Sequence, residues 1–169
     1  MKRTDIVGDN YAGSWNRERT GCRAVVLRED GKILIVAETA LDTWMLPGGG
    51  LEPGENDQAC CIREVAEETG VVIETSGCLM EIDEYYENWK YTNRYYLGVP
   101  VGTAPVRLTP QEEKAGLSAR WVLLKEAVAE FSGHERYRDK DEMKRGIYLR
   151  EYTALRELIP LELIPDADD

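Results

Sequence analysis

Three glutamates at helical spacing constrain this chain more than any other feature. At about 100° of rotation per residue, Glu64, Glu67 and Glu68 fall within one arc of about 100° on a helix. The opposite side carries residues that can pack on a core, namely Ile62, Val65, Ala66 and Thr69. This pattern predicts an amphipathic helix over residues 56–69, with one side in the core and another made entirely of carboxylates.

The ends of this helix and its charges narrow the interpretation. Asn56 is a favoured N-cap residue and Gly70 a favoured C′ residue, so they predict where the helix begins and ends. Glutamates three or four positions apart repel each other by about 0.2–0.5 kcal/mol per pair. A solvated surface tolerates this repulsion, whereas bound Mg²⁺ or Mn²⁺ relieves it, because hard cations prefer oxygen ligands. The carboxylates alone leave both interpretations open.

The spacing around the helix decides between them. Gly49, five residues, Glu55, seven residues and then the run from Arg63 to Val71 match the pattern G-x5-E-x7-REUxEExGU at every specified position. The chain therefore resembles the Nudix hydrolases. The resemblance implies an α/β fold, an α/β/α sandwich with a mixed β-sheet, the motif as a loop-helix-loop, and a C-terminal helix. It also implies hydrolysis of a nucleoside diphosphate linked to another group X, with Mg²⁺ as the cofactor and Mn²⁺ as a substitute.

The resemblance also implies roles for single positions. The expected metal ligands are the carboxylates of Glu64, Glu67 and Glu68 and the backbone carbonyl of Gly49. Glu55 and Gly70 are structural positions of the motif, and Arg63 is expected to orient a catalytic glutamate through an ion pair. A bound ion neutralises the diphosphate and lowers the pKa of a bound water, and a carboxylate then accepts the proton of that water.

The identity of this general base stays open between two places in the chain. One is the helix itself, with Glu67 or Glu68. The other is a later loop, where Glu112 or Glu113 follows Thr109 and Pro110. A pair of solvated loop glutamates is the alternative interpretation of Glu112 and Glu113.

Two arginines are candidate substrate ligands. Arg23 interrupts an apolar strand, and Arg94 lies between Asn93 and Tyr95. A buried guanidinium without a partner is costly, so each must either pair with a carboxylate of the core or face a cleft and bind phosphate.

The rest of the chain predicts strands, a helix, strands and a second helix around this motif. Apolar runs at residues 23–27 and 32–37 flank Glu29-Asp30-Gly31, which is a hairpin signal. Further strands are expected at residues 71–86, 95–101 and 121–124, with a loop in the stretch that follows the strand at 95–101 and a last helix ending before Pro160. We expect an N-terminal extension packed on the core at 1–18, one Nudix domain at 19–160 and an acidic tail at 161–169.

Composition restricts the partners. The chain has 169 residues and a formal net charge of −11, which disfavours binding of long nucleic acid. Its longest apolar run, from Ile33 to Ala37, is too short to span a membrane, and no apolar run follows the first residues as in a secretory signal. The four cysteines form no CxxC pair, so we expect reduced thiols in a cytoplasmic protein. The oligomeric state, including a homodimer, stays open.

Two function classes remain. The first is a Mg²⁺-dependent hydrolase acting on a small nucleotide derivative. The second is a catalytically silent module of the same fold that binds a nucleotide as a sensor. The motif is complete here, which favours the enzyme. The sequence does not select one substrate among the nucleoside diphosphate derivatives.

Overall fold

The computed structural model describes residues 1–163, which form two β-sheets with helices packed around them. The strands are β1 Lys2–Val7, β2 Arg17–Val26, β3 Lys32–Glu38, β4 Thr43–Met45, β5 Gly48–Gly50, β6 Val71–Thr75, β7 Met80–Tyr86, β8 Trp89–Thr103 and β9 Leu117–Leu123. The helices are α1 Asp57–Thr69, α2 Pro110–Ala115, α3 Leu124–Ser132 and α4 Glu142–Leu158, with short 3₁₀ turns at Gly133–Tyr137 and Leu161–Leu163.

The larger sheet is mixed and has the strand order β1-β7-β8-β2-β5, with β6 paired to another part of β8. The pairs β1 with β7 and β2 with β8 are parallel, whereas β8 pairs with β7 and β6 in antiparallel fashion. The smaller sheet is antiparallel and has the order β4-β3-β9. The long strand β8 is therefore the centre of the larger sheet, and the short strand β5 forms one of its edges.

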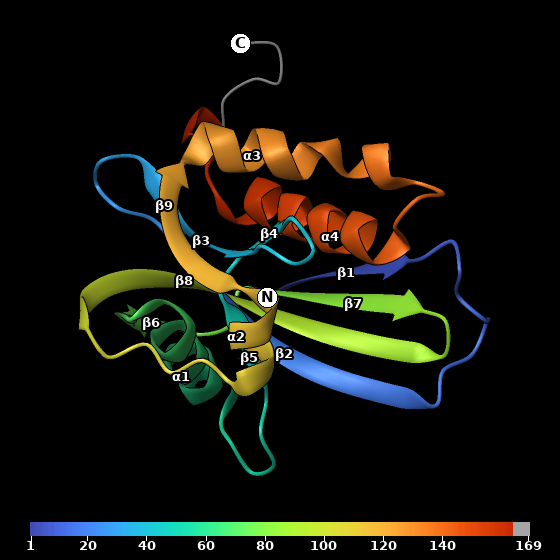
Figure 1. Ribbon diagram of the computed structural model, residues 1–169, viewed down its shortest axis with the longest axis horizontal. Coiled ribbons are helices and arrows are strands. Elements are labelled where there is room, and N and C mark those ends of the chain that lie inside the picture. Colours follow the sequence, from blue (N-terminus) through green and yellow to red (C-terminus); the bar gives the residue numbers. More distant parts are fainter. Residues whose placement is uncertain (164–169) are drawn as a thin grey trace.

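Helices cover the larger sheet from both sides (Figure 1). One core lies between this sheet, the smaller sheet and helices α3 and α4, and contains Ile82, Tyr95, Phe131 and Tyr148. The other core lies under α1 and contains Ala24, Val26, Val65 and Tyr96. Neighbouring residues of β2 and β8 thus point into different cores, as the alternation of side chains along a strand requires. The mixed α/β fold with a mixed sheet is confirmed.

Helix α1 forms where the sequence predicted it. The side chain of Asn56 accepts hydrogen bonds from the backbone N–H groups of Gln58 and Ala59, which satisfies two otherwise free donors. At the other end, Gly70 adopts a left-handed conformation with φ of 74°, which favours glycine. Val65 is completely buried, so the apolar side of the helix faces the core as expected.

The predicted hairpin between residues 23–27 and 32–37 is wrong. A tight turn is present, but only Leu27 and Ile33 form a bridge before the two strands diverge. Strand β2 already pairs with β8 on one edge and β5 on the other, so β3 has no free edge to join and enters the smaller sheet.

The ends of the chain add detail to the expected boundaries. Residues 2–7 of the expected N-terminal extension form strand β1 and pair in parallel with β7. Residues 161–163 of the expected acidic tail form a short 3₁₀ turn, and residues 164–169 lie outside the described part of the chain.

The strand expected at residues 95–101 is longer in the structure than predicted. Strand β8 continues to Thr103, and Gly98 and Pro100 lie within it, opposite β6. A register shift between Val72 and Ile73 of β6 accompanies Pro100, which cannot donate a ladder hydrogen bond. Among residues 1–163, no helix has the length and apolar character that a membrane crossing requires.

Candidate active site

The carboxylate of Glu68 is tied to the sheet edge. Its Oε2 accepts a hydrogen bond of 2.9 Å from the backbone N–H of Gly48, the first residue of β5. Glu68 is buried, and this burial raises the pKa of its carboxyl to about 8, although the Gly48 N–H and the charge of Arg23 oppose the shift. A cation bound beside this buried carboxylate would stabilise its ionised form.

Glu64 lies one turn earlier on α1 and packs against Gly49. A Cβ added at Gly49 would lie 2.3 Å from Oε2 of Glu64, so only glycine leaves room for this carboxylate beside the strand. Burial raises the pKa of Glu64, and the guanidinium of Arg63 opposes that rise. The glycine of the motif therefore has a steric role here, which the spacing alone did not reveal.

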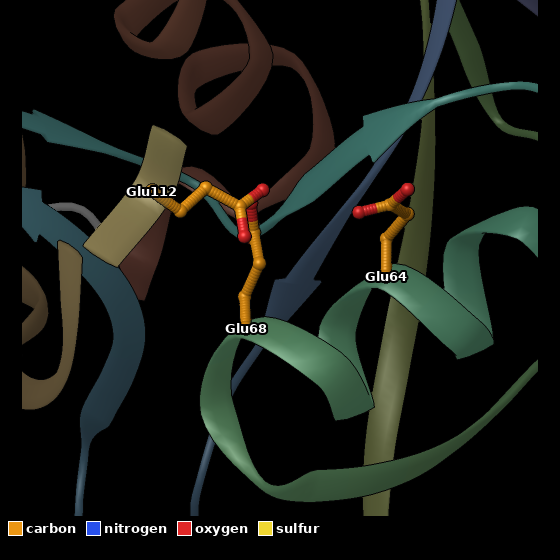
Figure 2. Close-up of side chains that lie close together, drawn as sticks. All are labelled: Glu64, Glu68 and Glu112. Atoms are coloured by element: carbon orange, nitrogen blue, oxygen red, sulfur yellow. The ribbon is translucent and has the colours of Figure 1, made fainter. Parts of the chain in front are cut away.

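Glu112 reaches the same place from a different part of the chain. Ligand oxygens of Glu64, Glu68 and Glu112 all lie within 4.8 Å of one another. Figure 2 shows the carboxylates of Glu68 and Glu112 next to each other, one from α1 and one from α2. These three residues are called the carboxylate triad below. Glu113, the other loop candidate, is exposed and does not belong to the triad.

Helix α2 is built to hold Glu112 in position. Thr109 accepts a hydrogen bond from the backbone N–H of Glu112, and the Glu112 carboxylate accepts one from the backbone N–H of Thr109. This reciprocal capping box and Pro110 at the start of the helix define its first turn. The sequence Thr-Pro-Gln-Glu is a signal for this helix start, and the loop expected there is wrong at residues 110–115, which form α2.

Arg63 connects the glutamates around the triad. Its guanidinium donates to Glu55 at 2.7 and 3.0 Å, to Glu64 at 2.8 Å and to Glu67 at 3.1 Å. It also donates to the backbone carbonyl of Gly50 at 3.3 Å. The hydrogen bonds from Arg63 lower the pKa of Glu55 to about 2. The contact between Arg63 and Glu55 ties the loop before α1 to the helix.

Glu67 occupies a different position from the other two helix glutamates. It is half-buried, pairs with Arg63 and is not a member of the triad. Its expected roles as metal ligand and as general base stay predictions.

Arg23 lies at the start of a buried polar network that sequence reasoning missed. Its guanidinium donates to Oδ1 of Asn93 at 3.1 Å and to the carbonyl of Leu46 at 3.3 Å. Asn93 in turn donates to Glu84 at 2.8 Å, and Arg150 of α4 donates to Glu84 at 3.2 Å. The network ends at Glu151, which accepts from Arg150 and from Tyr95.

No sequence signal distinguished this network. Glu84, Arg150 and Glu151 are buried, yet charged residues in a strand and on an amphipathic helix are typical of solvated faces. Only the alternation of side chains along β7 and β8, once their pairing is known, predicts that Glu84 and Asn93 lie on the same face of the sheet as Arg23.

Arg94 points to the opposite face of the sheet from Arg23. It pairs with Glu81 at 3.1 Å and with Asp57, the first residue of α1. The geometry therefore favours the carboxylate-pairing alternative for Arg94, and its substrate-binding role stays a prediction.

The donor set of the triad fits a hard divalent cation. It offers three carboxylates, two of them with raised pKa values, and the carbonyl of Gly49 belongs to the same sheet edge. Oxygen donors without histidine or thiolate ligands suit Mg²⁺ or Mn²⁺ rather than zinc.

Comparison with known proteins places this geometry in a family. A family model described as the NUDIX domain matches residues 17–142, which include the triad, Arg63 and the whole larger sheet except β1. The chain belongs to the NUDIX family. This family match, with the names of two relatives, confirms the expectation of a pyrophosphohydrolase at the level of the family.

One relative is the mouse protein named diphosphoinositol polyphosphate phosphohydrolase 2, with 28% identity over 131 residues, 75% of this chain and 71% of the relative. The other is a putative 8-oxo-dGTP diphosphatase of Bacillus subtilis, with 31% identity over 102 residues, 60% of this chain and 64% of the relative.

Solved structures agree with the NUDIX fold. A NUDIX hydrolase from Nitrosomonas europaea aligns with a TM-score of 0.54 at 22% identity, covering 88% of this chain and 97% of that one. A MutT protein from Methanosarcina mazei Go1 aligns with a TM-score of 0.52 at 18% identity, covering 82% and 96%. At these identities the similarity concerns the fold.

Proposed function

We propose that this NUDIX protein hydrolyses the pyrophosphate linkage of a nucleoside diphosphate linked to a group X, with Mg²⁺ as cofactor. The observation that carries the proposal is the carboxylate triad of Glu64, Glu68 and Glu112 at the glycine-rich sheet edge. The triad needs a cation to offset its charge, and a pyrophosphate needs the same cation because its own oxygens repel a nucleophile.

Different residues of the site bind the ion, position its ligands and contact the phosphate. The triad and the Gly49 carbonyl would hold the ion, which supplies charge neutralisation and an acidified water when bound. Arg63 fixes the directions of Glu64 and Glu67, and Glu55 fixes Arg63 in turn. Arg23 is positioned by Asn93 and Leu46 at the same sheet edge, where its charge can contact a phosphate oxygen.

The candidates for the general base are Glu112 on α2 and two glutamates on α1. Of the two loop candidates, Glu112 belongs to the triad and Glu113 is exposed, so we assign the loop role to Glu112. Glu67 and Glu68 are the alternatives on α1. Glu68 and Glu112 each accept a hydrogen bond from a backbone N–H, of Gly48 and Thr109 respectively, so these contacts do not decide between them.

The substrate is the finer part of the proposal. The relatives' names mention diphosphoinositol polyphosphates and 8-oxo-dGTP, which share a phosphoanhydride and differ in everything attached to it. We propose a small-molecule substrate of this kind, and the assay panel should therefore include both classes beside ADP-ribose, nucleotide sugars and dinucleoside polyphosphates.

The test is turnover by the purified protein with Mg²⁺, measured as released phosphate or nucleoside monophosphate. Variants Glu64→Gln and Glu68→Gln run beside the wild type, and Glu74→Gln, on strand β6 and outside the triad, is the matched control. Turnover of one class that requires metal and is lost only in the triad variants supports the proposal. Binding of a panel member without turnover would favour the silent sensor instead.

We also propose a reducing, cytoplasmic setting. All four cysteines are free thiols, and Cys22, Cys60 and Cys61 are completely buried. Buried thiols behave as small apolar residues, which fits a compartment where disulfides do not form.

A further inference from the structure

Three arginines lie in a row on strand β2. Arg17, Arg19 and Arg23 are separated by even numbers of residues, so their side chains leave the same face of the sheet. They span roughly 20 Å of strand, which is longer than a diphosphate and begins at the candidate active site.

The two outer arginines are free to bind an anion. Arg17 and Arg19 are exposed, and neither has a carboxylate oxygen within ion-pair distance among residues 1–163. This is unexpected in a chain with a net charge of −11, where acidic partners are abundant. Two adjacent, unneutralised guanidinium groups form a local positive surface.

Arg19 brings this positive surface up to strand β5. A Cβ added at Gly50 would lie 2.9 Å from Nη2 of Arg19, so the Arg19 guanidinium rests on the same glycine strand that carries Gly48 and Gly49. Gly50 also accepts a hydrogen bond from Arg63. Arg19 therefore lies against β5 on the face of the sheet where Arg23 leaves β2, whereas Glu64 meets Gly49 on the other face of the same strand.

Two stacked aromatic rings, called the aromatic wall below, lie beside Arg17 and Arg19. Trp89 and Tyr91 of β8 are the register partners of Arg17 and Arg19, and their rings stack with centroids 5.3 Å apart and planes 12° apart. The guanidinium of Arg17 lies over the Trp89 ring, 5.4 Å from its centroid. Burial raises the pKa of Tyr91, and the charges of Arg19 and Arg17 oppose that rise.

This wall favours an anion over a nucleobase. A ring face that already holds a guanidinium is not free to stack on a base, whereas the cation–π contact holds the guanidinium in place with its N–H donors available. Arg17 is thus pre-ordered for a phosphate or another oxyanion at low entropic cost.

We propose that Arg17 and Arg19 form an anion subsite that binds a phosphate group on the X part of the substrate, beyond the scissile pyrophosphate. That the bound molecule is a substrate rests on the proposed function, whereas the anion subsite is inferred from the residues alone. It selects, among nucleoside diphosphate derivatives and related phosphoanhydrides, those with further phosphates over those with a neutral X.

Binding without turnover tests the subsite by itself. The probe is inositol hexakisphosphate, whose phosphates are all monoesters, titrated calorimetrically into wild type, Arg17→Gln, Arg19→Gln and the double variant. Each single variant should bind about tenfold more weakly, since a charge-assisted phosphate contact of roughly 1.5 kcal/mol is lost. The double variant should also show a shallower dependence of log Kd on log salt.

Arg156→Gln is the matched control, because Arg156 is exposed and lies in the last turn of α4, which packs on the sheet end that carries Lys2. Its affinity for the probe should equal that of the wild type. Equal affinities in all variants, or an equal loss in Arg156→Gln, would overturn the subsite, because the attraction would then be absent or a property of net charge.

A matched pair of substrates connects the subsite to turnover. ADP-ribose and ADP-ribose 1″-phosphate carry the same pyrophosphate linkage and differ by one phosphate on the ribose that is the X group. The wild type should prefer the phosphorylated form in kcat/KM, and the preference should fall toward one in the double variant. A preference that survives in the double variant contradicts the proposal. If neither compound is turned over, the proposed function is in question, while the calorimetric result still decides the subsite.

Discussion

Nε of Arg23 donates a hydrogen bond of 3.1 Å to Oδ1 of Asn93, and this contact joins the candidate active site to the buried network under α4. Asn93 uses both ends of its amide, because its Nδ2 donates to Glu84. The orientation of the Asn93 amide is therefore determined by the charges on its two sides: a cation faces the oxygen and a carboxylate faces the nitrogen.

Replacing Asn93 by alanine should disturb Arg23 more than the fold. We expect kcat/KM to fall about tenfold, mainly through a higher KM, and the free energy of unfolding to fall by about 1–3 kcal/mol from the lost buried hydrogen bonds. Steady-state kinetics and urea unfolding measure the two effects. Asn88→Ala, which removes a contact with Asn16 at the exposed hairpin, is the control. An unchanged KM in Asn93→Ala would show that Arg23 needs no partner.

Arg150 should be among the least replaceable residues of α4. It pairs with Glu84 and Glu151, and all three side chains are almost completely buried. Arg150→Met leaves two carboxylates uncompensated in the core, so the free energy of unfolding should fall by about 3–5 kcal/mol. Arg156→Met on the same helix changes an exposed arginine and should cost less than about 0.5 kcal/mol. Similar losses in both variants, measured by urea unfolding, would contradict the network.

Glu112 and Glu113 provide a matched pair for the metal site. Glu112→Gln keeps an oxygen that can accept from the Thr109 N–H, so helix α2 should persist while one charge of the triad is lost. Affinity for Mn²⁺, followed by water-proton relaxation, should fall at least tenfold in Glu112→Gln and stay unchanged in Glu113→Gln. Equal Mn²⁺ affinities in the two variants would remove Glu112 from the site.

Gly49 should tolerate no side chain. Gly49→Ala places a methyl group 2.3 Å from Oε2 of Glu64, and the carboxylate must then turn away from the triad. We expect a loss of activity of at least about 100-fold, because positioning errors of this size remove catalytic alignment. Gly77→Ala, where the added Cβ meets nothing within 4 Å, is the control and should keep full activity. Wild-type activity in Gly49→Ala would show that Glu64 is not needed in its present position.

The pairing of Glu55 with Arg63 should make the loop before α1 sensitive to acid. Arg63 lowers the pKa of Glu55 to about 2, below the value of about 4.3 for an unpaired glutamate. The pair therefore stabilises the fold fully above about pH 4.3, and this contribution is lost as the pH falls toward 2. In buffer with EDTA, Glu55→Gln should show a weaker fall in unfolding free energy between pH 5 and 3 than the wild type. Parallel curves for the two proteins would contradict this.

The glutamate helix shows how far sequence reasoning reaches. Its caps Asn56 and Gly70, its buried Val65 and the pairing of Arg63 with Glu55 depend on residues close in sequence, and local rules describe them well. The family match then confirmed the resemblance over residues 17–142.

The missed features depend on distant partners. Whether residues 32–37 pair with β2 or form a second sheet is decided by which edges β8 and β5 already occupy. The burial of Arg150 is decided by Glu84, which lies far away in sequence on β7. Glu112 was a candidate from the sequence, but its advantage over Glu113 comes only from the direction that α2 gives it.

The split origin of the triad predicts an order of events during folding. Glu64 and Glu68 share one helix, but we expect Glu112 to join them only after the segment before β9 has docked and β9 has joined β3 in the smaller sheet. Such long-range pairing forms late, because the entropy of closing the intervening chain opposes it. The ability to hold a divalent ion should therefore appear last in refolding, and the rate of ion binding would report when the native state is complete.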